Sequence, residues 1–184
     1  MGRVSSIDLR GPFVLDTRDL GRRAGTQREY ELTVPAPPEL GIDVFAVPEG
    51  DDVDVDVRLE AVVDGVLATG TVFADLKGEC VRCLEPIDET VEVTFQELFV
   101  YDDGRDADVS EDDDEVSMLR DDLLDLEPLL RDAVVLALPF QPLCTDDCPG
   151  LCPECGARLA DDPDHAHGEP SDPRWAQLGK WSDS

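Results

Sequence analysis

Apolar and charged residues alternate most clearly over residues 53–61, a run of Val-Asp-Val-Asp-Val-Arg-Leu-Glu-Ala. A period of two is typical of a strand that buries one face, so this run predicts a strand. Asp64-Gly65 supplies a hairpin turn signal, and a second strand rich in Val, Thr and Phe is expected over residues 66–76. A third strand is expected from Thr90 toward Tyr101. Together these segments predict an antiparallel sheet.

Leucine and valine recur at three- and four-residue steps between residues 119 and 138, which is typical of an amphipathic helix. Asp121 and Asp122 would lie near the positive end of that helix dipole. Pro128 falls inside the pattern, so the helix is expected either to restart or to kink there. Pro139 ends the pattern. The expected fold class is therefore α+β, with a mainly antiparallel sheet and an amphipathic helix.

Two segments show little apolar periodicity. Residues 1–30 read as an irregular lead-in, and their basic patch fits a solvated loop better than a phosphate site; the patch comprises Arg18, Arg22, Arg23 and Arg28. Residues 102–116 form a low-complexity acidic run with little apolar content and are expected to be a disordered linker. The chain is expected to divide into a body over residues 1–143 and a Cys/His-rich tail over residues 144–184.

The charge of the chain is extreme, with 15 basic residues against 44 acidic residues and a formal net charge of −29. Such a surface repels phosphate backbones and steers basic proteins toward it, so direct RNA contact is disfavoured and a basic protein partner is expected. A GC-rich genome or a salt-adapted proteome explains the acidity equally well. The first ten residues lack the apolar core of a signal peptide, and no apolar run is long enough to span a membrane. A cytoplasmic protein is therefore expected.

In a cytoplasm, clustered cysteines indicate metal ligands or redox groups before they indicate disulfides. Structural zinc sites take four Cys or His ligands, usually as two chelating pairs. The six cysteines and two histidines of this chain supply four such pairs: Cys80 with Cys83, Cys144 with Cys148, Cys152 with Cys155, and His165 with His167. Two structural zinc ions are the expected cofactors.

The preferred partition joins the first two pairs into one site, which would staple the strand hairpin to the segment after the helix. The other two pairs would then form a local site in the tail. A rival partition joins the two Cys-x-x-Cys pairs as a zinc ribbon. Iron–sulfur binding, disulfide switching and thiol catalysis are alternatives for the cysteines. Eight ligands in two closed sets leave no open position for catalysis, which favours a structural metal.

Three motifs resemble those of a bacterial family known as YceD-like, the large ribosomal RNA subunit accumulation proteins. They are Cys80-Val-Arg-Cys83-Leu-Glu-Pro86, Gly150-Leu-Cys-Pro-Glu-Cys-Gly156 with the two cysteines before it, and Asp172-Pro-Arg-Trp-Ala-Gln-Leu178. The last begins with an N-cap and a proline, which predict a short terminal helix. Long-tailed members of the family often carry Cys-x-Cys where this chain has His165-Ala-His167.

The resemblance implies a role in accumulation, processing or assembly of large-subunit ribosomal RNA and implies no established reaction. The expected function is a non-enzymatic ribosome-biogenesis factor whose fold is fixed by zinc. One alternative is a zinc-dependent RNA-processing enzyme, although the chain has no phosphate-binding glycine loop and no cofactor fingerprint. Another alternative is a redox or zinc sensor that releases metal on oxidation.

Overall fold

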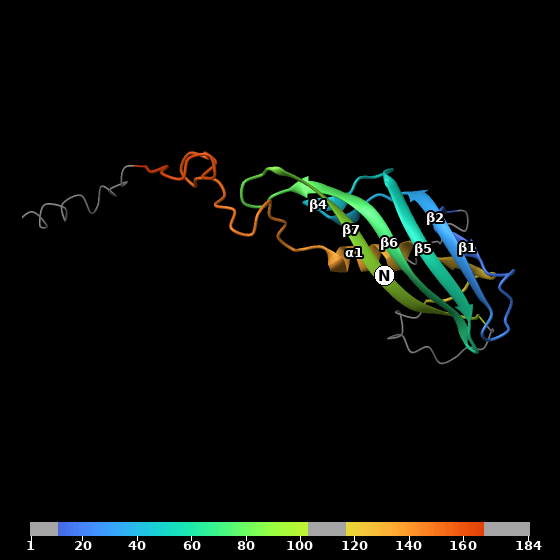
Figure 1. Ribbon diagram of the computed structural model, residues 1–184. Helices are drawn as coiled ribbons and strands as arrows, with labels where there is room; N and C mark the ends of the chain where they lie inside the picture. Colours follow the sequence, from blue (N-terminus) through green and yellow to red (C-terminus); the bar gives the residue numbers. More distant parts are fainter. Residues whose placement is uncertain (1–10, 103–116, 168–184) are drawn as a thin grey trace, which may run out of the picture.

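Four long antiparallel strands form the framework of the molecule, which we describe from a computed structural model over residues 11–102 and 117–167 (Figure 1). In spatial order they are β2 (Gln27–Pro35), β5 (Asp52–Ala61), β6 (Gly65–Glu79) and β7 (Pro86–Val100). β7 pairs with β6 along its whole length, from Gly65 opposite Val100 to Glu79 opposite Pro86. The predicted α+β class and the mainly antiparallel sheet are confirmed.

The remaining elements are short. They are β1 (Val14–Asp16), β3 (Leu40–Ile42), β4 (Phe45–Val47), β8 (Leu123–Asp125) and α1 (Glu127–Ala137). β4 pairs with the far end of β6, beyond the point where β5 stops, and β1 pairs with β8 in a separate two-stranded sheet. Three-residue strands carry too little alternation to stand out in a sequence, so none of these four was expected.

The predicted helix is confirmed only in its second half. α1 begins at Glu127 with Pro128 in its first turn, where a missing N–H costs nothing. The pattern before Pro128 was wrongly assigned to a helix, because residues 123–125 are β8. Asp121 and Asp122 adopt φ values of 54° and 60°, so they form a tight turn in front of β8 and do not lie at a helix end.

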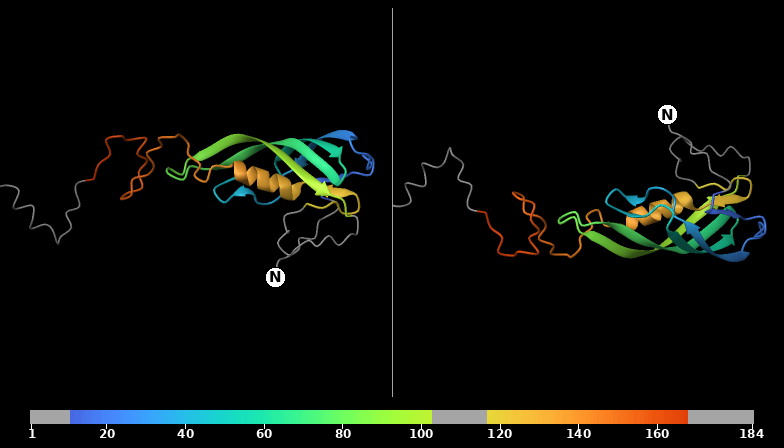
Figure 2. Two further views of the ribbon diagram at one scale, coloured as in Figure 1. Left: turned by 90° about the horizontal axis from the view of Figure 1, so that it is seen from below. Right: turned by 90° about the horizontal axis from the view of Figure 1, so that it is seen from above.

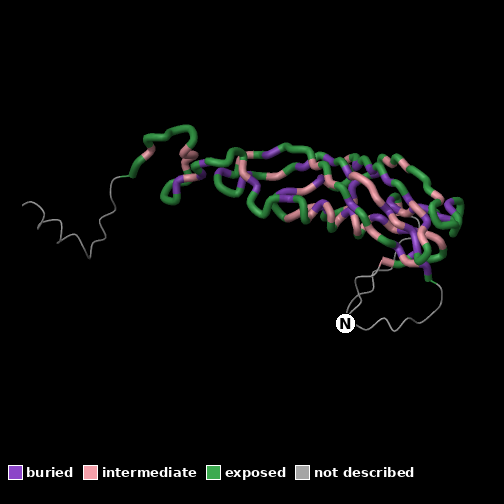
Figure 3. Tube along the Cα trace, turned by 60° about the horizontal axis from the view of Figure 1, so that its bottom comes forward, coloured by how far each residue is buried: buried purple, intermediate pink, exposed green. Residues whose placement is uncertain are grey.

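The core lies between one face of the sheet and α1. On the side of the sheet that faces α1, β5 buries Val53, Val55 and Leu59. The helix contributes Leu130 and Val134 to the same core. Figure 2 shows α1 and the β3–β4 ribbon on one side of the sheet, with no described element on the opposite side. Buried and exposed positions alternate along the strands accordingly (Figure 3).

The β6–β7 hairpin projects beyond the rest of the sheet and carries the loop with Cys80 and Cys83 at its tip (Figure 1). After α1 the chain runs back along this tip, where the Val81 N–H donates to the carbonyl of Pro142 at 3.0 Å. Residues 144–167 then extend away from the sheet (Figure 2). The hairpin therefore brings two segments together that are about sixty residues apart.

Several expectations concern residues that the structure does not describe. Apart from Asp102, the predicted acidic linker lies outside the described residues, as does the predicted terminal helix. The division into a body and a tail stays a prediction. In the described ranges, no helix is long and apolar enough to cross a membrane.

Replacing Leu59 by Ala is expected to lower the free energy of unfolding by about 2–5 kcal/mol, because Leu59 is fully buried in the sheet core. The matched control is Leu136→Ala on α1, whose side chain is 85% exposed, and it should change stability by less than about 0.5 kcal/mol. Urea unfolding of both variants measures the difference. Equal effects would contradict the position of the core.

Candidate metal centres

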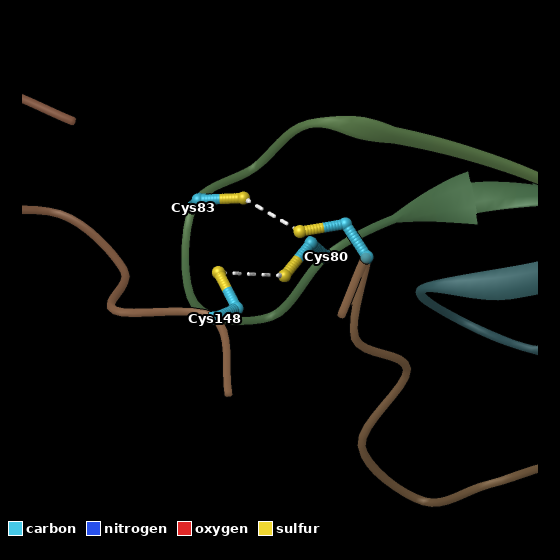
Figure 4. Close-up of side chains that lie close together, drawn as sticks. Cys80, Cys83 and Cys148 are labelled. Carbon is cyan, nitrogen blue, oxygen red and sulfur yellow. Dashed lines mark hydrogen bonds between the residues drawn. The ribbon is translucent and has the colours of Figure 1, made fainter. Parts of the chain in front are cut away.

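Four cysteine sulfurs converge where the β6–β7 tip meets the segment after α1. Cys80 and Cys83 come from the tip loop, and Cys144 and Cys148 come from the returning chain; we call these four residues the four-cysteine cluster. All four sulfurs lie within 4.8 Å of one another. Figure 4 shows the side chains of Cys80, Cys83 and Cys148 pointing toward a common centre. Three of the four residues are buried, and Cys144 is exposed.

The separations between these sulfurs fit a tetrahedral metal better than a disulfide. The sulfurs of Cys80 and Cys148 are 3.8 Å apart, and those of Cys83 and Cys144 are 3.5 Å apart. Four zinc–sulfur bonds of about 2.3 Å at tetrahedral angles would place the sulfurs about 3.8 Å apart. A disulfide requires about 2.05 Å, and all six cysteines are free. The cluster has the donor set and the spacing that a structural zinc site needs.

The second cluster lies further along the tail and mixes two cysteines with two histidines. Its members are Cys152, Cys155, His165 and His167, which we call the mixed cluster. The Cys155 sulfur lies 3.2 Å from the Nε2 atoms of both His165 and His167, and those two nitrogens are 2.9 Å apart. A zinc ion would hold the sulfur–nitrogen pairs about 3.6 Å apart, so a modest expansion would admit it.

Carboxylates stand behind both imidazoles of the mixed cluster. The Nδ1 atom of His165 is 3.7 Å from an Asp162 carboxylate oxygen, and the Nδ1 atom of His167 is 3.5 Å from one of Glu154. A carboxylate facing the second ring nitrogen of a histidine helps to orient the ring toward a metal. With Nε2 turned toward the cluster and Nδ1 toward a carboxylate, both rings are arranged as metal ligands usually are.

The two Cys-x-x-Cys loops adopt the same turn. In the first, the N–H of Cys80 donates to the carbonyl of Glu85, and the N–H of Leu84 donates to the carbonyl of Cys80. In the second, the N–H of Cys152 donates to the carbonyl of Ala157, and the N–H of Gly156 donates to the carbonyl of Cys152. Leu84 and Gly156 occupy the same place in the turn, with φ values of 61° and 73°.

This turn requires a left-handed backbone at its fifth residue, which glycine adopts without strain and leucine does not. The sequence offers Gly156 for the second loop, whereas Leu84 in the first must be held in place by its surroundings. The repeated geometry turns both sulfurs of each loop in one direction. Each loop therefore supplies two of the four donors in its candidate cluster.

Backbone N–H groups support the negative charge of one sulfur in each cluster. Burial opposes ionisation of Cys80, but the N–H groups of Cys144 and Arg82 point at its sulfur and lower its pKa to about 6. At Cys152 the N–H of Cys155 has the largest effect, and the pKa again falls to about 6. Both thiols are thus prepared to act as thiolate ligands near neutral pH.

Arg82 joins the two clusters. Its guanidinium donates to the carbonyl of Cys148 at 2.9 Å, and its own carbonyl accepts from the N–H of Leu151 at 3.1 Å. Gly150 suits this approach, because its φ of 79° favours glycine and a Cβ there would lie only 3.1 Å from the Arg82 carbonyl oxygen. Arg158 adds an ion pair of 2.7 Å with Glu85. The mixed cluster is therefore docked on the loop that carries the four-cysteine cluster.

The structure groups the eight predicted ligands as in the preferred partition. It does not bring the two Cys-x-x-Cys pairs together in one cluster, as the rival zinc-ribbon partition requires. That these residues bind metal stays a prediction. Sequence reasoning missed the roles of Arg82, Asp162 and Glu154, because their spacing from the ligands gave no signal. The arginine patch of the lead-in is engaged in part: Arg18 pairs with Asp16, and Arg22 lies 3.4 Å from Asp122.

Comparison with known proteins gives one family. The family model described as large ribosomal RNA subunit accumulation protein YceD matches residues 68–181. The uncharacterized protein Rv2926c of Mycobacterium tuberculosis is 45% identical over 177 residues, which cover 96% of this chain and 84% of that protein. The uncharacterized protein YlbN of Bacillus subtilis is 26% identical over 111 residues, covering 60% of this chain and 62% of YlbN. No solved structure gives a significant match.

Replacing Cys152 and Cys155 by Ser is expected to remove one bound zinc ion and to leave one, because the four-cysteine cluster draws no ligand from the mixed cluster. Metal analysis of the purified variant, beside the unaltered protein with two expected ions, measures the stoichiometry. Complete loss of zinc from the variant would contradict this grouping, because it would show that the four-cysteine cluster also depends on Cys152 and Cys155.

Lowering the pH is expected to release zinc from the four-cysteine cluster more steeply than from the mixed cluster. Protons compete with the metal for thiolates, and the first cluster has four thiols where the second has two. Since the pKa of Cys80 is about 6, that thiol resists protonation longest, and the others release protons on binding. Zinc affinity is measured between about pH 8 and about pH 6 on two variants. Cys152→Ser/Cys155→Ser gives the pH slope of the four-cysteine cluster, and Cys80→Ser/Cys83→Ser gives that of the mixed cluster. Equal slopes would contradict this assignment.

Proposed function

This chain belongs to the YceD family of large ribosomal RNA subunit accumulation proteins, and from that membership we propose that it is a non-enzymatic ribosome-biogenesis factor of the bacterial cytoplasm. It would support accumulation, processing or assembly of large-subunit ribosomal RNA. The observation that carries the proposal is the match of the family model, which covers most of β6, all of β7 and α1, and all eight candidate ligands.

We further propose that two structural zinc ions hold the protein in shape. The support for this is the donor set of each cluster, the sulfur separations of 3.5 and 3.8 Å, and the carboxylates behind both histidines. Each cluster offers four protein ligands. A catalytic zinc keeps one position for water or substrate, so the closed sets favour structural ions and disfavour a zinc-dependent RNA-processing enzyme.

The direct partner in this proposal is a basic ribosomal or RNA-processing protein. A formal net charge of −29 makes approach to an RNA backbone unfavourable and approach to a basic protein favourable. Ribosomal RNA would then be affected through that protein. The same charge disfavours sequence-independent RNA binding.

Depleting the protein in its own host is expected to reduce mature large-subunit ribosomal RNA relative to small-subunit ribosomal RNA. Expression of the unaltered chain should restore the ratio, and Leu136→Ala should restore it equally because that side chain is exposed. Cys80→Ser/Cys83→Ser should not restore it, because the proposed zinc ion could no longer join the tip loop to the returning segment. Quantified ribosomal RNA and subunit profiles provide the measurement, and unchanged profiles on depletion would refute the proposal.

A further inference from the structure

No described element covers the face of the sheet opposite α1 (Figure 2). The residues that point outward on this face are rich in carboxylates. Its outward positions on β2, β5, β6 and β7 alternate with the buried positions of the core. We call this surface the acidic face and define it by six exposed carboxylates: Glu31, Asp52, Asp54, Asp56, Asp75 and Glu92. The basic side chains that point outward from these four described strands are Arg58 and Lys77.

Those two basic side chains do not neutralise the centre of the acidic face. Lys77 lies 3.2 Å from Asp51 and stands opposite Asp88, while Arg58 stands opposite Glu29. Within the described part of the chain, no ion pair engages Asp54, Asp56 or Glu92. The centre keeps its negative charge.

The register of the strands places carboxylates opposite one another. Glu31 of β2 is directly opposite Asp56 of β5. Like charges in opposite positions of neighbouring strands destabilise a sheet. These opposed carboxylates therefore do not stabilise the folded chain alone. A cationic group bound between them would turn the repulsion into attraction.

An aromatic side chain lies in the middle of these carboxylates. Phe73 of β6 is 37% exposed, with Asp54 of β5 opposite on one side and Glu92 of β7 opposite on the other. The three side chains line a hollow of about 370 Å³ that also includes Asp52, Asp75 and Thr90. Since neighbouring strands are about 4.8 Å apart, a cation over the Phe73 ring would be within reach of both carboxylates.

We propose that the acidic face docks an arginine-rich segment of a basic protein, with one guanidinium stacked on Phe73 between Asp54 and Glu92. Arginine fits this hollow better than lysine, because its planar group stacks on an aromatic ring and donates to carboxylates at the same time. A nucleic acid would meet the same carboxylates with phosphates and be repelled. The inference rests on the proposed function in that it assigns a surface to the basic partner.

Binding is tested on the purified full-length chain with a labelled synthetic peptide of alternating arginine and glycine, beside a lysine counterpart of equal charge. Phe73→Thr should weaken the arginine peptide about 2–5-fold and affect the lysine peptide less. Asp54→Asn/Glu92→Gln should weaken it about tenfold. In that variant the amide oxygen at position 54 can still accept the 2.6 Å bond from the Thr33 hydroxyl, so the sheet should be preserved.

The matched control is Asp132→Asn/Glu39→Gln, which removes the same two charges from exposed sites on the helix side of the sheet and should change affinity less than about twofold. Thermal unfolding of each variant identifies any that does not fold. Equal loss of affinity in the control pair, or unchanged binding by a folded Phe73→Thr variant, would overturn the proposal. Binding of a single-stranded RNA oligonucleotide that weakens with the same substitutions would also overturn it.

The same variants in depleted cells separate this inference from the proposed function. We expect Asp54→Asn/Glu92→Gln to fail to restore large-subunit ribosomal RNA while the control pair restores it. If the variant restores it fully, the docking surface is wrong and the proposed function stands. If depletion itself leaves ribosomal RNA unchanged, the proposed function fails whatever the peptide titration shows.

Discussion

The pairing of β6 with β7 is the interaction on which the rest of the structure depends. Every residue from Gly65 to Glu79 has a partner on β7, without a bulge, so one register sets both ends of a 15-residue hairpin. A slip of one residue would turn Phe95 and Phe99 out of the core. It would also misplace the turn that holds Cys80 and Cys83. The same ladder therefore fixes the hydrophobic core at one end and half of the four-cysteine cluster at the other.

Beyond the tip of that hairpin, apolar burial no longer accounts for order. In residues 144–167 the buried positions are Cys148, Gly150 and Cys152, two of which are candidate ligands. The segment is held to the tip loop by the bond from the Leu151 N–H to the Arg82 carbonyl, by the bond from the Arg82 guanidinium to the Cys148 carbonyl, and by the ion pair between Arg158 and Glu85. A segment with so little core needs another source of cohesion, and metal ligation supplies it in small domains of this kind. A metal that organises the tail then has a structural purpose without any chemistry of its own.

The sequence was informative where a physical signal repeats and uninformative where it does not. Alternation over residues 53–61 predicted β5, and ligand spacing predicted both clusters, because each signal occupies several positions. The stretch before Pro128 misled, since leucines at helical spacing also suit a tight turn followed by β8. The docking of one cluster on the other through Arg82 could not be predicted, because it depends on a carbonyl and a guanidinium that meet Leu151 and Cys148 only in three dimensions.

One face of the sheet is apolar and buried, and the other is acidic and exposed. Metal binding does not reduce the negative charge of the exposed face. The helix side buries valine and leucine, while the outward side presents carboxylates that oppose one another across the strands. Binding two divalent cations through six thiolates would add more negative charge than it removes, so a chain of formal charge −29 stays strongly acidic when loaded. The repulsion between Glu31 and Asp56 thus persists in the metal-bound protein. Among the described residues no ion pair relieves it, which is the physical reason to look for a cationic partner on that face.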